Sequence, residues 1–305
     1  MTVEPTENVG VIGLGIMGSA MSTRMIGAGR RVIGTDVDDL RLAEHRTRGG
    51  VIVETPYDVA CHASAIITSL PSDTALLEVI AALHGLETAD RQDLVIIETS
   101  TLSLDAKRTA RALAQAAGIT LLDCPVSGSA PQALAGELVA YVSGDDSAKS
   151  RASDVMGDLV SRWYDVGAFG NGSRFKFVTN MLVAVHTLAA AEALLLARRL
   201  GLDFDRVLEV VGNSAGTSRM LELRGPLMAD EGYSEPFVRI RTFLKDLDLI
   251  DRAAETAGSP TPLLTRAASY YRGAQDAGRG DQDAAAVFAF LEAGAGPSNE
   301  APQHP

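Results

Sequence analysis

The chain has 305 residues, a formal net charge of −12 and a charged fraction of 22%. This length suggests about two domains and leaves ample chain to bury a hydrophobic core. Nucleic acids and anionic membranes attract basic surfaces, so the acidic balance argues against both as main partners. The two cysteines, Cys61 and Cys124, do not imply a disulfide framework.

The N-terminus and the longest apolar stretch are the two candidates for a targeting or membrane segment. MTVEPTENVG has neither a basic start nor an apolar core, so no signal peptide is expected. The apolar stretch 177–197 approaches the length of a membrane span, but Asn180, His186 and Glu192 interrupt it. A buried helix is therefore favoured over a transmembrane one. We expect a cytoplasmic protein with no membrane partner.

Six short apolar runs in the first half of the chain predict strands. They are VGVIG (9–13), RVIGTD (31–36), AIITSLP (65–71), LVIIETS (94–100), ITLLDCP (119–125) and LVAYVSG (138–144). Helical patterns such as 74–83 and 105–117 lie between them. Alternating strands and helices predict an α/β domain, in which helices cover both faces of a doubly wound parallel sheet.

After about residue 168 the pattern changes to long helical runs rich in alanine and leucine. These runs are 173–200, 204–213 and 243–257, and no convincing strand follows them. We therefore predict an α/β domain over 8–168 and an all-α domain over 169–293, joined by a long interdomain helix. The Gly- and Pro-rich end, 294–305, is predicted to be a disordered tail.

The segment VGVIGLGIMG places three glycines in G-x-G-x-x-G spacing, directly after a strand and at the start of a helix. This pattern is typical of dinucleotide binding, because the glycines allow a tight turn, approach of the pyrophosphate and close helix packing. The free N–H groups at the helix start bind the pyrophosphate charge. The cofactor contacts are expected from Gly13, Leu14, Gly15, Ile16, Met17 and Gly18.

Asp36 ends the strand that follows this helix, and Val37 comes next. An acid about 20 residues after the glycines binds the ribose hydroxyls of NAD and repels the 2′-phosphate of NADP. The sequence therefore favours NAD, while Arg41 nearby leaves NADP as the less favoured cofactor.

A second motif, DCPVSGSAPQALAGEL, spans 123–138 and begins where a predicted strand ends. Ligands of open α/β sheets collect at such strand ends. Ser127 and Gly128 offer a hydroxyl and backbone N–H groups that suit a substrate carboxylate. Composition alone, however, favours an ordinary turn rich in proline and glycine.

The third motif, GNGSRFKFVTN, opens the long helical run, with Ser173 expected as its N-cap. Lys176 and Asn180 are four residues apart and so share one helix face. Lys176 could be a surface side chain that extends to solvent. Its apolar neighbours instead predict partial burial, which lowers the pKa of a lysine and makes it usable as an acid or base.

In this order, GLGIMG with Asp36, DCPVSG and GxGxxxKxxxN resemble the β-hydroxyacid dehydrogenase family. That family includes 3-hydroxyisobutyrate, tartronate-semialdehyde and L-threonate dehydrogenases. A fourth block, FLKDLDLIDRAAETAGSPTPL, is similar to the family's KDL helix. The likeness covers about residues 8–292, and segments 183–193 and 213–226 look closest to the L-threonate dehydrogenase-like branch.

This resemblance implies an N-terminal Rossmann domain, a helical domain and NAD-dependent oxidation of a short hydroxy acid. Carried over by motif, Lys176 would be the catalytic acid/base, and the substrate would be bound by Ser127, Gly128 and Asn180. The cofactor side would include Leu70, Pro71, Thr101 and Lys245. The resemblance also implies a homodimer or homotetramer.

Some positions depart from the family pattern and leave alternatives open. Ser129 replaces the second glycine of PVSGG, and Thr179 stands where a second asparagine is common, which puts the substrate in doubt. An imine-reductase-like oxidoreductase or a non-catalytic dinucleotide-binding protein are the alternatives, and Lys176 argues against the first. Arg219 either contacts substrate or is solvated, and His186 is expected to pack within its helix. No metal-ligand cluster is visible.

Overall fold

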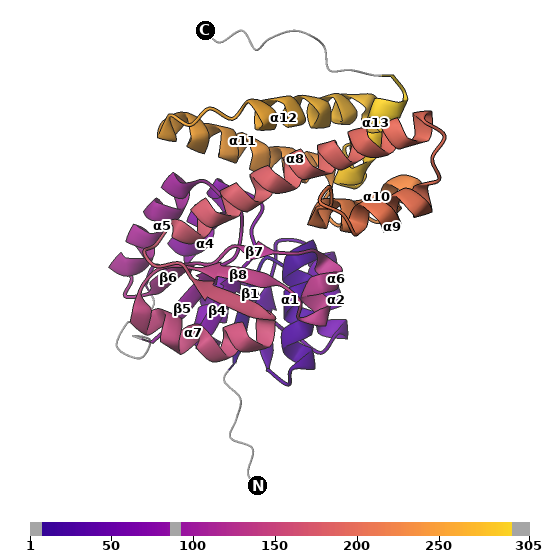
Figure 1. The fold of residues 1–305 in the computed structure, drawn as a ribbon. Helices are drawn as coiled ribbons and strands as arrows, with labels where there is room; N and C mark the ends of the chain where they lie inside the picture. Colours follow the sequence, from indigo (N-terminus) through magenta and orange to yellow (C-terminus); the bar gives the residue numbers. More distant parts are fainter. Residues whose placement is uncertain (1–7, 86–92, 295–305) are drawn as a thin grey trace. The chain divides into compact units, whose positions relative to one another are not determined.

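The structure is a computed structural model that describes residues 8–85 and 93–294 (Figure 1). The chain divides into two compact units, one ending at Lys176 and the other beginning at Phe177. Of the predicted tail 294–305, residues 295–305 lie outside the described residues.

A six-stranded parallel sheet organises the N-terminal unit (Figure 1). Its strands lie in the order β3-β2-β1-β4-β5-β6, so the direction of winding reverses between β1 and β4. The predicted doubly wound sheet is confirmed. The strands are β1 (Val9–Ile12), β2 (Val32–Thr35), β3 (Val51–Ile52), β4 (Ala65–Thr68), β5 (Val95–Glu98) and β6 (Thr120–Asp123).

Helices cover both faces of this sheet. On one face pack α1 (Ile16–Gly27), α6 (Ala130–Ala135) and α7 (Asp146–Leu159); on the other pack α3 (Pro56–His62), α4 (Asp73–Ala82) and α5 (Leu104–Ala116). Helix α2 (Asp39–Thr47) joins β2 to β3. The neighbours Ile66 and Ile67 enter opposite core clusters, as do Ile96 and Ile97. A strand covered on both faces needs an apolar residue at every position, which explains the continuous apolar runs.

A second, three-stranded sheet has the order β7-β8-β9. It comprises β7 (Val126–Ser127), β8 (Val139–Val142) and β9 (Arg162–Asp165), with β7 antiparallel and β9 parallel to β8. The sequence predicted β8 but missed β3, β7 and β9. Two of these strands are only two residues long, and β9 is mostly exposed, so none has the apolar pattern of a buried strand.

The rest of the chain is helical, and no strand follows β9 among the described residues. The predicted all-α region is confirmed. Its helices are α8 (Asn171–Arg199), α9 (Phe204–Gly212), α10 (Arg219–Ala229), α11 (Ile240–Ala257), α12 (Pro262–Ala274) and α13 (Val287–Glu292), with short helical turns at Gln275–Arg279 and Ala284–Ala286. The boundary between the two units lies within α8.

Helix α8 differs from its prediction in two respects. It begins at Asn171, so Ser173 lies inside the first turn instead of capping the helix. Not all of its apolar residues are buried, because Phe175 is 51%, Val178 62% and Leu182 48% exposed. These three recur at intervals of three and four and so form one stripe. Among the described residues, α8 is also the one helix that length and composition alone would allow to span a membrane.

Candidate active site

The predicted cofactor and substrate residues of the N-terminal unit gather at one edge of the parallel sheet. The turn 13–18 follows β1, Leu70 and Pro71 follow β4, Thr101 follows β5, and the segment 123–128 begins at the last residue of β6. Parallel strands place their carboxyl ends at the same edge, where α/β sheets bind ligands.

The glycine turn has the geometry that its predicted roles require. Gly13 has a φ of +89°, and a Cβ on Gly13 or Gly18 would overlap with a backbone carbonyl oxygen. A Cβ on Gly15 would meet only the Arg41 guanidinium, at 3.4 Å. Gly15 is the N-cap of α1 and offers no side chain to its N–H groups. The start of α1 therefore suits the pyrophosphate of a dinucleotide.

The other residues of this turn differ in exposure. Leu14 is buried, Ile16 is 60% exposed and Met17 is half-buried. Among the loop residues that were predicted to lie near the cofactor, Pro71 is exposed and Thr101 is half-buried.

Asp36 lies directly after β2 and is held by two backbone N–H groups. Its Oδ2 accepts from Leu14 N at 2.6 Å, and its Oδ1 accepts from Asp38 N at 2.9 Å. Nη1 of Arg41, a half-exposed side chain, lies 3.6 Å from Oδ2. A carboxylate for ribose hydroxyls thus stands next to a cation that could accept a 2′-phosphate. These residues fit either NAD or NADP.

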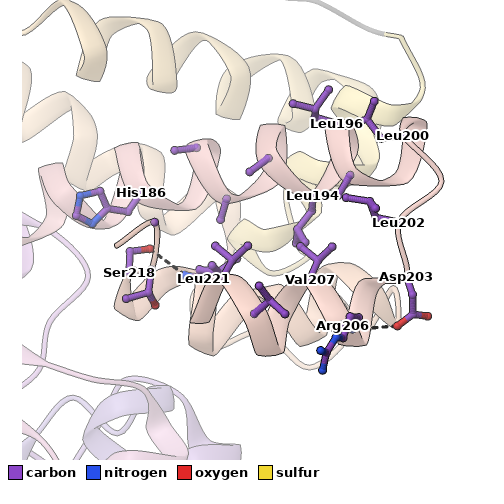
Figure 2. Close-up of a pocket in the computed structure, with 18 of the residues that line it drawn as sticks. His186, Leu194, Leu196, Leu200, Leu202, Asp203, Arg206, Val207, Ser218 and Leu221 are labelled. Carbon is purple, nitrogen blue, oxygen red and sulfur yellow. Dashed lines mark hydrogen bonds between the residues drawn. The ribbon is translucent and has the colours of Figure 1, made fainter. Parts of the chain in front are cut away.

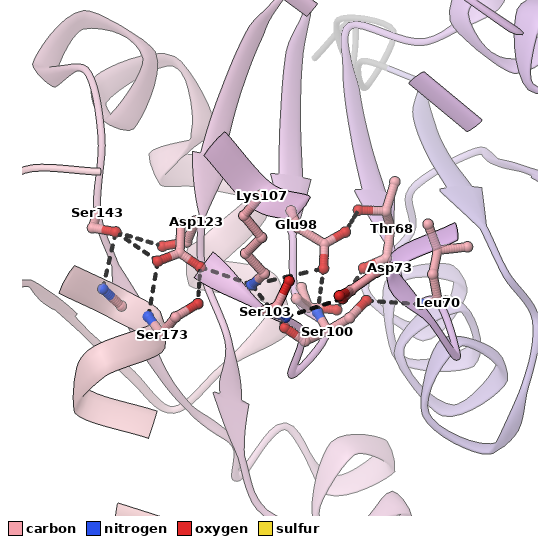
Figure 3. A network of polar contacts seen from close by, with 12 residues as sticks. Thr68, Leu70, Asp73, Glu98, Ser100, Ser103, Lys107, Asp123, Ser143 and Ser173 are labelled. Atoms are coloured by element: carbon pink, nitrogen blue, oxygen red, sulfur yellow. Dashed lines mark hydrogen bonds and ion pairs between the residues drawn. The ribbon is translucent and has the colours of Figure 1, made fainter. Parts of the chain in front are cut away.

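A buried polar network joins the ends of β4, β5 and β6 (Figure 3). Lys107 of α5 is fully buried at its centre, where Nζ donates to Asp123 Oδ1 at 2.8 Å and to Ser100 O at 2.7 Å. Glu98 Oε1 lies 3.8 Å from the same nitrogen. Burial acts to lower the pKa of Lys107, but the charges of Asp123 and Glu98 outweigh it and raise that pKa. Lys107 is therefore charged at neutral pH.

Two further contacts extend the network to the loop after β4. Glu98 accepts hydrogen bonds from Ser100 N, at 2.7 Å, and from the Thr68 hydroxyl. The Ser100 hydroxyl in turn accepts from Leu70 N at 2.8 Å. Figure 3 shows these groups pointing toward one another from neighbouring strand ends.

Asp123 connects this network to the first turn of α8. Its Oδ2 accepts from Ser173 N and its Oδ1 from the Ser173 hydroxyl, both at 2.8 Å (Figure 3). Burial acts to raise the pKa of Asp123, but the charge of Lys107 and hydrogen bonds from Lys107 and Ser173 outweigh it and lower that pKa. The Asp123 carboxylate therefore serves the N-terminus of α8 as a capping side chain would, which is why Ser173 is not the cap.

The first turn of α8 also packs closely against the segment 123–128. A Cβ on Gly172 would come within 2.5 Å of two carbonyl oxygens, one from Asp123 in that segment and one from Tyr141. Phe175 stacks on Tyr141 with ring centroids 6.1 Å apart. Lys176 is half-buried and lies three residues after Ser173, on the turn that follows. The predicted catalytic lysine thus belongs to a turn that is held by the segment containing the predicted carboxylate-binding residues.

Within that segment some polar groups bond other protein groups, and others are accessible to a ligand. The Ser129 N–H and hydroxyl both donate to Gln132 Oε1, at 2.9 and 3.0 Å, and so cap α6. Ser129, which departs from the PVSGG pattern, is thus used structurally. Ser127 is half-buried in β7, and Gly128 is exposed with a φ of +138°.

Two predicted site residues lie in the helical unit and share one partner. Asn180 is buried, and its Nδ2 donates to Asp246 Oδ2 at 3.0 Å. Nζ of Lys245, which is 38% exposed, lies 3.7 Å from Asp246 Oδ1. The structure therefore brings Asn180 of α8 and the KDL segment of α11 together. Asn180 lies about one turn after Lys176 on α8.

An apolar pocket of about 840 Å³ lies between the second half of α8, α9 and α10 (Figure 2). His186 is exposed and lines it, so the prediction that His186 packs within its helix was wrong. The neighbouring Ala189 and Ala193 are too small to cover that ring. Figure 2 shows Leu194, Val207 and Leu221 lining the same pocket.

Arg219 behaves as a solvated residue. Its side chain is 67% exposed, and Nη1 pairs with Glu222 Oε2 at 2.9 Å on the same helix. Within the described parts of the chain, no group of three or more His, Cys, Asp or Glu side chains could hold a metal ion.

Glu98 and Lys107 were not among the predicted site residues, and no role was predicted for Asp123, which begins the second motif. The two acids carried a signal, because each ends a mostly apolar strand that should be buried. Lys107 carried none, since an amphipathic helix such as α5 ordinarily exposes its lysines.

Comparison with known proteins identifies the family. Residues 8–167 match the NAD binding domain of 6-phosphogluconate dehydrogenase, and residues 170–291 match the NAD-binding family of NADP-dependent 3-hydroxyisobutyrate dehydrogenase. An L-threonate dehydrogenase from Cupriavidus necator is 33% identical over 285 residues, which cover 93% of this chain and 95% of that protein. The chain belongs to the β-hydroxyacid dehydrogenase family.

Other relatives agree with this assignment. A probable 3-hydroxyisobutyrate dehydrogenase from Mycobacterium bovis is 31% identical, covering 86% of this chain and 90% of that protein. The crystal structure of 3-hydroxyisobutyrate dehydrogenase from Salmonella typhimurium has a TM-score of 0.83 at 29% identity and covers 93% of this chain and 99% of that one. An imine reductase from Pseudomonas sp., with a TM-score of 0.63 at 18% identity, shares the fold alone. The β-hydroxyacid dehydrogenase is thus an NAD(P)-dependent oxidoreductase that acts on CH–OH groups, as predicted.

Proposed function

We propose that this β-hydroxyacid dehydrogenase oxidises a short hydroxy acid of the 3-hydroxyisobutyrate or L-threonate type, with NAD as cofactor and Lys176 as general acid/base. One observation carries the proposal. Asp123 fixes the turn that bears Lys176 at the edge of the sheet from which the loops after β4 and β5 extend. The names of the related L-threonate and 3-hydroxyisobutyrate dehydrogenases support the substrate class.

Substrate binding would fall to three residues. The Ser127 hydroxyl and the Gly128 N–H would donate to the substrate carboxylate. One N–H of the Asn180 amide is directed to Asp246, which leaves its carbonyl oxygen and second N–H for a substrate hydroxyl. Two separate polar anchors would orient the carbinol carbon and so raise the rate through positioning.

Lys176 would move the proton. During oxidation its neutral amine accepts the hydroxyl proton as the carbonyl forms, and in reduction its ammonium donates that proton to the developing alkoxide. The nicotinamide, when bound, supplies the acceptor for the hydride that leaves the carbinol carbon.

The cofactor would be held by the residues 13–18 at the start of α1, by Asp36 at the ribose, and by Leu70, Pro71, Thr101 and Lys245 near the nicotinamide. NAD is the proposed preference, because Asp36 would repel a 2′-phosphate. The neighbouring Arg41 provides the test. Arg41→Ala should weaken NADP binding by about tenfold and leave NAD binding unchanged, as measured by the quenching of protein fluorescence. Equal loss for both cofactors would count against this arrangement.

The central experiment measures NADH formation with a panel of short 2- and 3-hydroxy acids. Lys176→Ala should lower kcat by about 10²–10⁴-fold while NAD still binds. Arg174→Ala is the matched control, since Arg174 is an exposed residue of the same turn whose guanidinium donates to Asn171 Oδ1. It should retain wild-type turnover. Equal turnover in wild type and Lys176→Ala would refute the lysine mechanism, and NAD binding without turnover of any acid would favour a non-catalytic dinucleotide-binding protein.

We also propose a cytoplasmic homodimer or homotetramer, which the family resemblance supports. Light scattering of the purified protein should give the mass of two or four chains. A monomer at micromolar concentration would contradict this part of the proposal.

A further inference from the structure

Lys107 is a buried cation that the proposed mechanism does not use. Its relative exposure is 0%, and both nearby carboxylates, Glu98 and Asp123, are also fully buried. Burying an ion pair yields little net stability, because the cost of removing charges from water offsets their attraction. Such a pair instead fixes the positions of its neighbours, because a buried charge is tolerated only when its bonding partners stay in place. The position of Lys107 in the network shows which elements it fixes.

Each contact of Lys107 leads to a different part of the sheet edge (Figure 3). Through Ser100, whose carbonyl it bonds at 2.7 Å, it reaches the loop after β5 that contains Thr101. The Ser100 hydroxyl accepts a hydrogen bond from Leu70 N at 2.8 Å, which links this loop to the loop after β4. Through Asp123, at 2.8 Å, it reaches the two Ser173 hydrogen bonds in the first turn of α8.

We infer that Lys107 is a positioning residue for hydride transfer: it holds the two cofactor-side loops and the turn bearing Lys176 in one fixed arrangement. The inference rests on the proposed function, because it assumes that these loops contact the nicotinamide and that Lys176 moves the proton. Lys107 touches neither reactant itself. Its effect comes through Ser100 on one side and through Asp123 on the other.

The chain contains a matched control for this inference. Lys149 of α7 is also buried, at 5% exposure, and also pairs with two acids, Asp146 and Asp165, each at 2.7 Å. Those acids are 96% and 50% exposed, so the pair faces solvent. Its ion pairs with Asp146 and Asp165 do not involve the loops after β4 and β5 or the first turn of α8. Lys149→Met therefore removes a buried lysine without touching the network.

The kinetic test compares Lys107→Met with Lys149→Met. Lys107→Met should lower kcat by on the order of 10–100-fold, the effect of a displacement of about 1 Å between reacting groups. The dissociation constant of NAD should change less than about threefold, because the partners of Asp36 and the glycine turn lie outside the network. Lys149→Met should leave kcat unchanged. If Lys107 only stabilised the fold, both variants would lower the fraction of active protein to a similar extent, and kcat per active site would not change.

The structural test is amide hydrogen exchange, which needs no substrate. Lys107→Met should speed exchange in both segments that it connects, 98–104 and 171–177. Asp123→Asn should speed exchange in 171–177, and Glu98→Gln in 98–104, because each removes one arm of the network. These two variants conserve side-chain shape, so exchange measured on them still tests the inference if Lys107→Met fails to fold.

The two tests separate this inference from the proposed function. If wild type turns over no hydroxy acid, the proposed function fails, while the exchange pattern still decides whether Lys107 connects the two segments. If wild type is active and Lys107→Met matches Lys149→Met in kcat and in exchange, the inference is overturned and the proposed function stands.

Discussion

Helix α8 is fixed by a buried ion pair in each of the two units, and the two pairs have different neighbours. In the N-terminal unit the pair is Lys107 with Asp123, which bonds Ser173 of α8. In the helical unit Arg224 Nε lies 3.4 Å from Asp283 Oδ1, and Arg224 Nη1 donates to the Thr187 hydroxyl of α8 at 2.6 Å. Both pairs are almost fully buried, so each holds one part of α8 in position.

The remaining contacts show what each pair organises. Asp283 accepts from three backbone N–H groups, those of Phe237, Val238 and Ala285, at 2.8 to 3.2 Å. It therefore shapes the connection before α11 and the turn after α12. Asp123 instead serves the turn that bears Lys176. The same physical device thus supports packing in one unit and, in our proposal, chemistry in the other.

The largest predicted effect is the loss of either acid. Asp123→Ala and Asp283→Ala should each lower the free energy of unfolding by about 3–5 kcal/mol, because each removes the nearest carboxylate from a buried cation. Urea denaturation followed by circular dichroism measures this. Asp165→Ala is the control and should cost about 1 kcal/mol or less, since Asp165 is half-exposed. A loss below 1 kcal/mol for either buried acid would break the comparison.

A smaller effect distinguishes the two pairs in turnover. Arg224→Met should reduce stability but leave kcat within about threefold, because its bonded partners are Thr187, Met220 and Asp283, which the proposed mechanism does not use. A tenfold gap in kcat between Arg224→Met and Lys107→Met corresponds to about 1.4 kcal/mol in the activation barrier. Steady-state kinetics at a temperature where both variants stay folded would measure it. Equal losses would show that the pairs do not differ in role.

The pH dependence of stability should also separate the pairs. The pKa of Lys107 is raised in the fold, so its contribution is complete below the unfolded value of about 10.4 and is lost as pH rises through the folded value. The pKa of Asp123 is lowered, so its contribution is present above about 3.9 and is lost as pH falls through the folded value. Between these limits the pair is intact.

An arginine keeps its charge over the alkaline range, so the pair in the helical unit should not weaken there. The stability difference between wild type and Lys107→Met should therefore shrink above about pH 10.4, while that between wild type and Arg224→Met stays constant. Urea denaturation from pH 7 to 11.5 would show it. A constant difference for both variants would contradict the assignment of Lys107 as a charged, network-bound group.

The smallest effect is expected at an exposed pair. Arg219→Ala should change stability by less than about 0.5 kcal/mol and leave kcat unchanged, because Arg219 and Glu222 form a solvated pair on one helix. Thermal denaturation and the hydroxy acid assay together measure this. A clear rise in KM would instead assign Arg219 to the substrate.

Much of the fold was predictable because its signals are local. The apolar runs at β1, β4 and β5 follow from burial on both faces, and α5 and α11 each end within two residues of a glycine, Gly118 and Gly258. The short strands β3, β7 and β9 were not predictable, since their pairing depends on distant partners. The position of Ser173 was misjudged for the same reason. Its partner Asp123 lies 50 residues earlier in the chain.

The sequence by itself determined the glycine turn, the alternation of the longer buried strands with helices, and the family motifs that include Lys176. These depend on backbone conformation and on the spacing of neighbouring residues. Only the tertiary structure decided that Lys107 is buried and charged, because a lysine on α5 acquires that environment from two strand ends and a helix start. Burial of a charge is a property of the whole arrangement, since the cost of desolvation is met only when every partner is in place.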